Sequence, residues 1–273
     1  LVGKEDLPNA IALNSMIFNG SRIVGPSLAG ILVAIPQIGP AGAFWINGVS
    51  FLAVLASLAV MDHKPGPIST QGRSMLGNIV EGMKYARTSS IISTLMLMAT
   101  ITSIFGMSYN TMMPLMARDV LKVGAAGQGI MMTCVGIGAV IGLLAMATLS
   151  GAVPTGRIFV ASNLLFPPML LLVALSRSFP LTLTALLILG GALMVLNAAT
   201  NTLLQTAVPD HLRGRVMGLY NVTFNGMMPF GSLQTGIVAD AFGAPIALAV
   251  GGVVCLARAC WLALRASHLR DLR

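Results

Sequence analysis

Charged residues are scarce in this sequence: they make up 9% of its 273 residues, whereas hydrophobic residues make up 56%. A soluble domain has about 25% charged residues, so this composition excludes an ordinary soluble protein and indicates one that folds in lipid. Acidic residues are the fewest, with 8 Asp and Glu against 16 Lys and Arg. The net charge of +8 does not indicate a nucleic-acid partner, because the basic residues stand singly between apolar runs.

Cysteine and histidine are also rare, with three of each. The cysteines lie inside apolar segments without the spacing of metal ligands, and we interpret them as small packing residues. They are Cys134, Cys255 and Cys260. The histidines lie in predicted loops or the tail and have no paired ligand. The sequence therefore predicts neither a metal site nor a cofactor, and it argues against an enzyme.

Long hydrophobic runs dominate what is present. Eight segments are long and apolar enough to cross a bilayer, which takes about 20 residues. They are residues 10–35, 41–61, 91–116, 127–149, 158–175, 181–208, 216–239 and 244–264. The single long connection, residues 62–90, carries Met75, Ile79, Met83 and Ala86 at helical spacing, which predicts an amphipathic helix on the membrane surface. We therefore expect an all-α membrane protein with eight transmembrane helices.

Lys and Arg are distributed unevenly over the loops. Eleven fall on one side, which includes both ends of the chain and the long connection, and three fall on the other. The positive-inside rule then places both termini and the connection in the cytoplasm of a multi-pass protein of the cell membrane. The remaining two, Arg22 and Arg258, lie within spans. Arg258 is seven residues before Arg265, so we expect its side chain to extend to the cytoplasmic interface.

Residues 13–31 and 219–237 indicate an internal repeat. A shift of 206 positions gives seven identities in nineteen positions, including a shared Phe-Asn-Gly. Parallel repeats of six-helix halves occur in secondary transporters. If the first span corresponds to the seventh, four spans precede Leu1 and the whole protein has twelve. Residues 1–61 would then end the first half, 62–90 would be a cytoplasmic linker, and 91–273 would form the second half and the tail.

Two motifs resemble the major facilitator superfamily. SRIVGPSLAG (residues 21–30) is similar to the Gly-Pro motif of that family's fifth helix, and LLQTAVPDHLRGRVMGLY (residues 203–220) is similar to the loop entering its eleventh helix. The matching motif residues are Gly25, Pro26, Gly30, Arg213, Gly214 and Arg215. Together with LPNAIALNSMIFNGSRIVGP (residues 7–26), the amino-acid sequences of these motifs are most similar to those of the family's drug and siderophore efflux branch.

The resemblance covers nearly the whole chain, as helices five to twelve. It implies a secondary transporter that exports a small, partly apolar molecule by alternating access between two halves. Proton coupling is implied only by the resemblance, since none of the eight predicted spans contains Asp or Glu. The alternative is a membrane scaffold or sensor that has the same fold and does not transport.

Polar residues that share helix faces are candidates for the substrate cavity. In the first span, Asn19 and Arg22 share a face, and Arg22 lies near mid-membrane, where an arginine must face protein or water and find a partner. The third and sixth spans correspond, by resemblance, to the family's seventh and tenth helices. Their candidates are Ser103, Tyr109, Asn110, Asn197, Asn201 and Gln205. Hydrogen bonding between helices is the alternative role for these side chains.

Small residues indicate where helices approach closely. Gly138 and Gly142 form a small-xxx-small pattern, and Gly25 and Gly30 with Pro26 would allow a close approach and a bend. In the second repeat the matching glycines are Gly231 and Gly236. We predict that all of these serve helix packing and the rocking of the two halves.

Overall fold

The computed structural model describes residues 32, 35, 37–60, 83–149 and 152–265. Every regular element in this part of the chain is helical. The helices are α2 (Gly39–Val60), α4 (Ser90–Ile101), η1 (Thr102–Gly106), α5 (Tyr109–Leu115), η2 (Met116–Val120), α6 (Gly124–Leu149), α7 (Thr155–Leu175), α8 (Phe179–Ala207), α9 (Asp210–Phe242) and α10 (Ala244–Arg265). The first predicted span and most of the linker lie outside the described residues.

Six helices in the described part of the chain are long and apolar enough to cross a membrane. They are Ala41–Val60, Ser90–Val120, Gly124–Leu149, Thr155–Leu175, Phe179–Ala207 and Ala244–Leu264. These six match predicted spans. Helix α9 contains the predicted span 216–239 and has 33 residues, but it is not among these six, because Asn221, Asn225 and Gln234 lower its hydropathy. That α9 crosses the membrane stays a prediction.

The third predicted span is one continuous helical path with two π-helical turns. In η1 the amide of Met107 donates to Thr102 O at 2.8 Å, and in η2 the amide of Leu121 donates to Met116 O at 2.9 Å. Both bonds join residues five apart, so each turn is wider than an α-turn. Such π-bulges occur mostly at functional or strained positions. Pro114 lies between them in α5, where its missing N–H further weakens the regular ladder.

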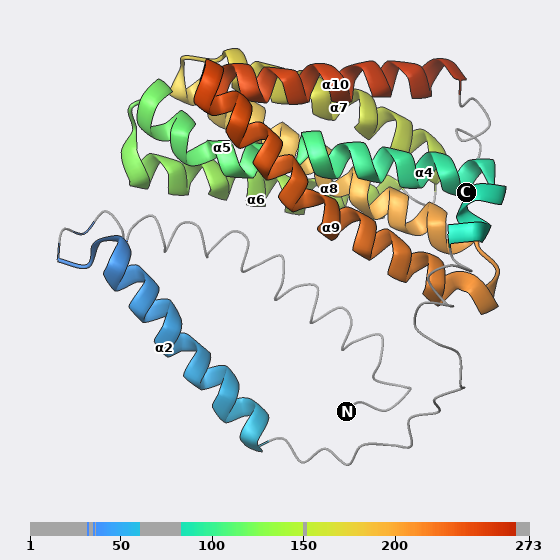
Figure 1. Ribbon diagram of the computed structural model, residues 1–273, viewed down its shortest axis with the longest axis horizontal. Coiled ribbons are helices and arrows are strands. Elements are labelled where there is room, and N and C mark those ends of the chain that lie inside the picture. The colour runs from blue at the N-terminus through green and yellow to red at the C-terminus, as the bar shows by residue number, and fades with distance from the viewer. Residues whose placement is uncertain (1–31, 33–34, 36, 61–82, 150–151, 266–273) are drawn as a thin grey trace.

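The helices from α4 to α10 form one bundle, and α2 lies apart from it (Figure 1). Helix α8 is central, since it packs along both α6 and α7, and α7 packs in turn along α10. Two buried clusters form the core, one around Tyr109 and Phe166 and the other around Ile92 and Phe159. The side chains of α2 are exposed, Trp45 by 77%, as expected for a helix whose surroundings are lipid.

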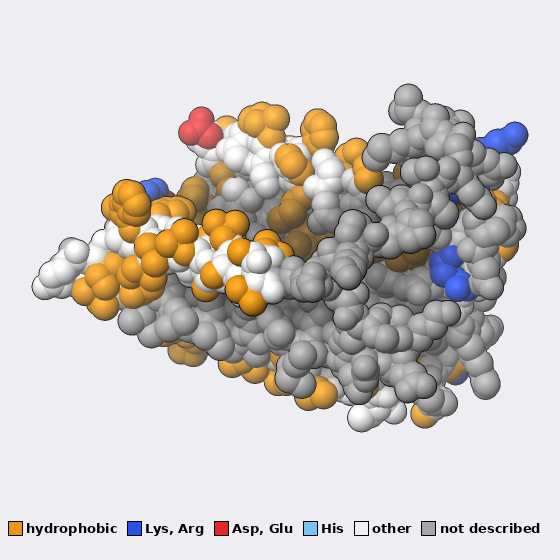
Figure 2. Space-filling view, turned by 90° about the horizontal axis from the view of Figure 1, so that it is seen from below, with side chains coloured by type: hydrophobic (Ala, Val, Ile, Leu, Met, Phe, Trp, Pro, Cys, Tyr) orange, Lys and Arg blue, Asp and Glu red, His pale blue; other side chains and the backbone are white. Residues whose placement is uncertain are grey.

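Hydrophobic side chains cover much of the described surface, and Lys and Arg appear mainly towards one end of the molecule (Figure 2). That end carries the first turns of α4, α7 and α9. The two ends of the bundle thus differ in how many Lys and Arg residues they carry, as the uneven distribution of basic residues over the loops predicts. The side of the membrane on which this end lies stays a prediction.

Candidate functional site

The polar residues of α8 form a row along one side of the helix. Asn197 and Asn201 are half-buried and Gln205 is exposed, and the Gln205 amide Nε2 donates to Asn201 Oδ1 at 2.5 Å. Within the described residues the Asn197 side chain has no hydrogen-bond partner. Its amide is therefore available to a bound molecule, whereas the amides of Asn201 and Gln205 partly satisfy each other.

Asn197 lies on the side of α8 opposite an apolar groove. Val195 lines that groove, and Asn197 follows Val195 by two residues, which is about 200° around an α-helix. Residues four apart differ by about 40° around the helix, so Asn201 and Gln205 turn progressively towards the side of the groove. That the row lines an internal cavity stays a prediction.

The cavity candidates of the third predicted span, which corresponds to the family's seventh helix, divide into two kinds. Ser103 is fully buried and donates its hydroxyl to Phe224 O of α9, and Tyr109 is 1% exposed within the core. These two side chains lie inside the bundle, where the alternative role of hydrogen bonding or packing between helices fits them, and their place in a substrate cavity stays a prediction. Asn110 is half-buried, with its amide Nδ2 at 3.4 Å from Met107 O, and is the most exposed of the three.

The basic motif before the seventh predicted span is helical, which corrects the loop predicted there. Helix α9 begins at Asp210, so Arg213, Gly214 and Arg215 all belong to its first two turns. Arg213 donates from Nε to Gln205 O at 3.0 Å and so joins the start of α9 to the end of α8. No described atom lies within 4 Å of a Cβ placed on Gly214.

Gly138 and Gly142 lie where α6 crosses α8. A Cβ on Gly138 would be 2.7 Å from the carbonyl carbon of Leu187, and one on Gly142 would be 2.6 Å from Gly191 O. From the other side, a Cβ on Gly190 would be 2.9 Å from the Cα of Val135. The two helices therefore touch backbone to backbone at this crossing.

The repeat glycines of α9 differ from each other. A Cβ on Gly231 would be 2.8 Å from the Cα of Ile104, so α9 packs directly against the η1 turn. At Gly236, in contrast, no described atom comes within 4 Å of such a Cβ. The close approach predicted at Gly236 is not found within this part of the chain. Asn19, Arg22, Gly25, Pro26 and Gly30 lie outside the described residues.

Arg258 of α10 is buried at the centre of a polar cluster that the sequence did not reveal. Only 5% of Arg258 is exposed. Its Nη1 donates to Met98 O at 2.7 Å and to the Thr102 hydroxyl, and its Nη2 donates to Asn163 Oδ1 at 2.6 Å. The expectation that Arg258 reaches the cytoplasmic interface is therefore wrong. The side chain instead joins α10 to α4, η1 and α7.

Asn163 and Thr102 are the polar residues that sequence analysis missed. Asn163 is fully buried and donates Nδ2 to Phe159 O at 3.0 Å, so its oxygen is held towards Arg258. The available signal was the need of any intramembrane arginine for polar partners. Asn163 is the one amide in its predicted span. In the described residues no group of three or more His, Cys, Asp or Glu could hold a metal ion.

The apolar helices and their bundle define a class, the multi-pass helical membrane proteins, and the comparison with known families narrows it. Residues 1–272 match the family described as transmembrane secretion effector, a branch of the major facilitator superfamily. The chain belongs to this family. Its members are transporters and not enzymes, which confirms both the sequence resemblance and the prediction that this protein is not an enzyme.

Individual relatives include efflux and siderophore proteins. The multidrug efflux pump Tap of Mycolicibacterium fortuitum is 24% identical over 241 residues, covering 87% of this chain and 58% of that protein. The staphyloferrin A transporter of Staphylococcus aureus is 26% identical over 257 residues, covering 93% and 62%. The enterobactin exporter EntS of Shigella flexneri is 25% identical over 230 residues, covering 82% and 52%.

The fold is similar to that of a bacterial homologue of the human lysosomal transporter Spinster, solved in an inward-facing and unoccupied conformation. The TM-score is 0.62 at 16% identity, covering 98% of this chain and 71% of that chain. At this identity the similarity shows the fold alone. The chain spans between 52% and 62% of the length of the curated relatives named above.

Proposed function

We propose that the protein exports small, partly apolar molecules across the cell membrane by alternating access, as a secondary transporter. The observation that carries the proposal is the half-buried amide of Asn197, which begins the row that continues with Asn201 and Gln205 and lies on the side of α8 facing away from the apolar groove. Amide side chains are uncharged, so they can hydrogen-bond a transported molecule without binding it as tightly as a charged side chain would. The relatives support the export direction, since they include a multidrug efflux pump and a siderophore exporter.

In this proposal residues 91–273 form the second six-helix half, residues 62–90 the linker, and residues 1–61 the last two helices of the first half. The backbone contacts at Gly138 and Gly142 hold α6 close to α8, and the contact at Gly231 holds α9 close to η1, which supports a half that moves as a unit. A rigid half is what rocking around a central site requires. Coupling to protons belongs to the proposal too, and the coupling carboxylate would lie outside the described spans.

Replacing Asn197 by alanine should lower efflux about fivefold, because one hydrogen bond between the Asn197 amide and the exported molecule contributes about 1 kcal/mol. The measurement is energy-dependent efflux of ethidium, a small and partly apolar dye, from cells making the protein as its gene encodes it. Rates are normalised to folded protein in detergent. Thr184→Ala is the control, because Thr184 is exposed on the same helix and bonds its own helix at Pro180 O.

Nigericin, which collapses the pH gradient, should abolish this efflux if protons drive it. Equal efflux by Asn197→Ala and the unmodified protein would contradict the proposal that α8 forms part of the cavity wall. If neither ethidium nor an iron-chelating siderophore is exported by the unmodified protein, the scaffold or sensor function replaces transport.

The charge asymmetry predicts sidedness. With the three native cysteines replaced by alanine, single cysteines at Gln37 and Ala241 should react with a membrane-impermeant maleimide added outside intact cells. Single cysteines at Gln71 and His211 should react only after the cells are opened. The reverse pattern would place the basic end of the bundle outside and would contradict the assignment of residues 62–90 as a cytoplasmic linker.

A further inference from the structure

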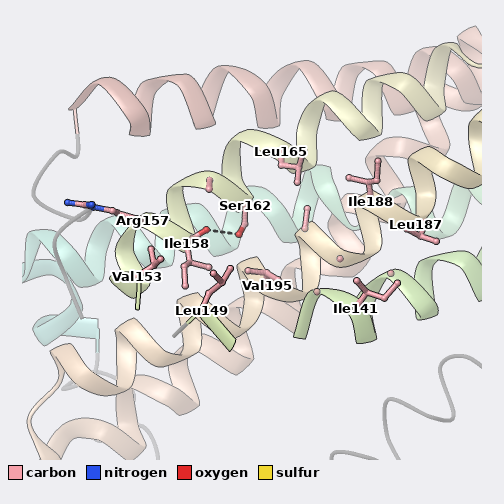
Figure 3. Close-up of a pocket in the computed structure, with 15 residues that line it drawn as sticks. Ile141, Leu149, Val153, Arg157, Ile158, Ser162, Leu165, Leu187, Ile188 and Val195 are labelled. Atoms are coloured by element: carbon pink, nitrogen blue, oxygen red, sulfur yellow. Dashed lines mark hydrogen bonds between the residues drawn. The ribbon is translucent and has the colours of Figure 1, made fainter. Parts of the chain in front are cut away.

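A groove of about 530 Å³ runs along the outside of the bundle between α6 and α7, with α8 as its floor. Its walls are apolar from end to end, and Arg157 stands at one end (Figure 3). Ser162 also lines it, but the Ser162 hydroxyl donates to Ile158 O of its own helix at 2.6 Å. The groove therefore suits a long apolar group that ends in an anion.

The surroundings of the groove are those of a lipid-facing surface. Ile141 and Leu165 form part of its rim and are 52% and 45% exposed. Few side-chain atoms fill the floor of the groove, because Gly138, Gly142 and Gly191 bring α6 and α8 together through their backbones. The hollow thus follows directly from the glycine crossing, and in a bilayer it opens towards acyl chains.

The length of the groove matches one leaflet of a membrane. Gly138 and Leu149 are eleven residues apart on α6, or about 16 Å, and Arg157 and Leu165 are eight apart on α7, or about 12 Å. Half of a hydrocarbon core about 30 Å thick is about 15 Å. Arg157, in the first turn of α7, lies where the headgroups of that leaflet would be, and its side chain is exposed.

We propose that this groove is a binding site for an anionic phospholipid, with one acyl chain between α6 and α7 and the phosphate on the Arg157 guanidinium. The guanidinium offers several N–H donors in a fork that fits a phosphate. Net negative charge on the headgroup is preferred, because a zwitterionic lipid places a second cation close to Arg157. The site is separate from the polar row of α8, so it does not depend on what the protein exports.

Native mass spectrometry of the delipidated protein in detergent tests this, with phosphatidylglycerol and phosphatidylcholine titrated separately. We expect one phosphatidylglycerol molecule to bind more tightly than any phosphatidylcholine. Arg157→Gln should weaken that binding about fivefold, the effect of one basic residue near an anionic lipid surface. Ala161→Trp, an exposed small position inside the groove, should remove the tight lipid by filling its place.

Two matched variants serve as controls and should bind like the unmodified protein. Arg177→Gln removes an exposed arginine just beyond the opposite end of α7, and Leu164→Trp places the same indole on α7 outside the groove. Equal affinity for the two lipids, or unchanged binding in Arg157→Gln, would overturn the proposal. If Ala161→Trp does not give a monodisperse protein, the comparison of Arg157→Gln with Arg177→Gln decides alone.

Discussion

Alanine at Gly138 should lower the apparent melting temperature of the detergent-solubilised protein by about 5–10 °C, corresponding to about 2–3 kcal/mol of overpacking. The added Cβ would come within 2.7 Å of the Leu187 carbonyl carbon and 3.1 Å of its Cα. Both atoms belong to the backbone, so no rotamer change can relieve the contact. Helix α6 would have to move away from α8, and the packing along the most extensive helix pair of the bundle would be lost.

Gly236→Ala provides the matched control, since the same Cβ is added to another glycine inside a helix. Apart from its chain neighbours and the backbone of its own helix, no described atom lies within 4 Å of a Cβ at Gly236. In a helix interior alanine is favoured over glycine by about 0.8–1.0 kcal/mol, so this variant should melt at the same or a slightly higher temperature. Equal melting temperatures for the two variants would contradict the backbone contact between α6 and α8.

Asn163→Leu should destabilise the protein by about 2–3 kcal/mol, because a hydrogen bond to a charged group is lost and the cation stays buried. The Asn163 oxygen accepts from Arg258 Nη2 at 2.6 Å, while Arg258 itself is 5% exposed. Leucine fills a similar volume but offers no acceptor. The measurement is the folded fraction by size-exclusion chromatography together with the melting temperature in detergent.

The double variant Asn163→Leu/Arg258→Met distinguishes this hydrogen bond from a simple effect of size. Replacing both partners of a buried polar pair by apolar groups is often nearly neutral. The Thr102 hydroxyl keeps its bond to Met98 O at 2.9 Å when the arginine is gone. We therefore expect the double variant to recover most of the stability lost in Asn163→Leu. Losses that simply add would show that Asn163 and Arg258 are not coupled.

The sequence by itself determined the membrane class, the family and most of the helices. These follow from the length of apolar runs and from the residues of short sequence motifs, and both are properties of residues close together in the chain. The matches at residues 41–61, 127–149 and 158–175 are of this kind. The prediction failed locally at Arg213 and Arg215, where the structure has helix instead of a loop, because these basic residues were assigned to a connection between spans.

Only the tertiary structure decided which side chains meet. Whether Arg258 extends to the interface or into the bundle depends on the polar groups of α4 and α7, which lie 95 residues or more away in the chain. In the same way, Ser103 has the polarity of a cavity residue but bonds to α9. A single helix fixes the face on which a residue lies, whereas the neighbour across that face is set by how the helices cross. The close contact of Gly138 with α8 and the groove beside Arg157 both depend on that crossing.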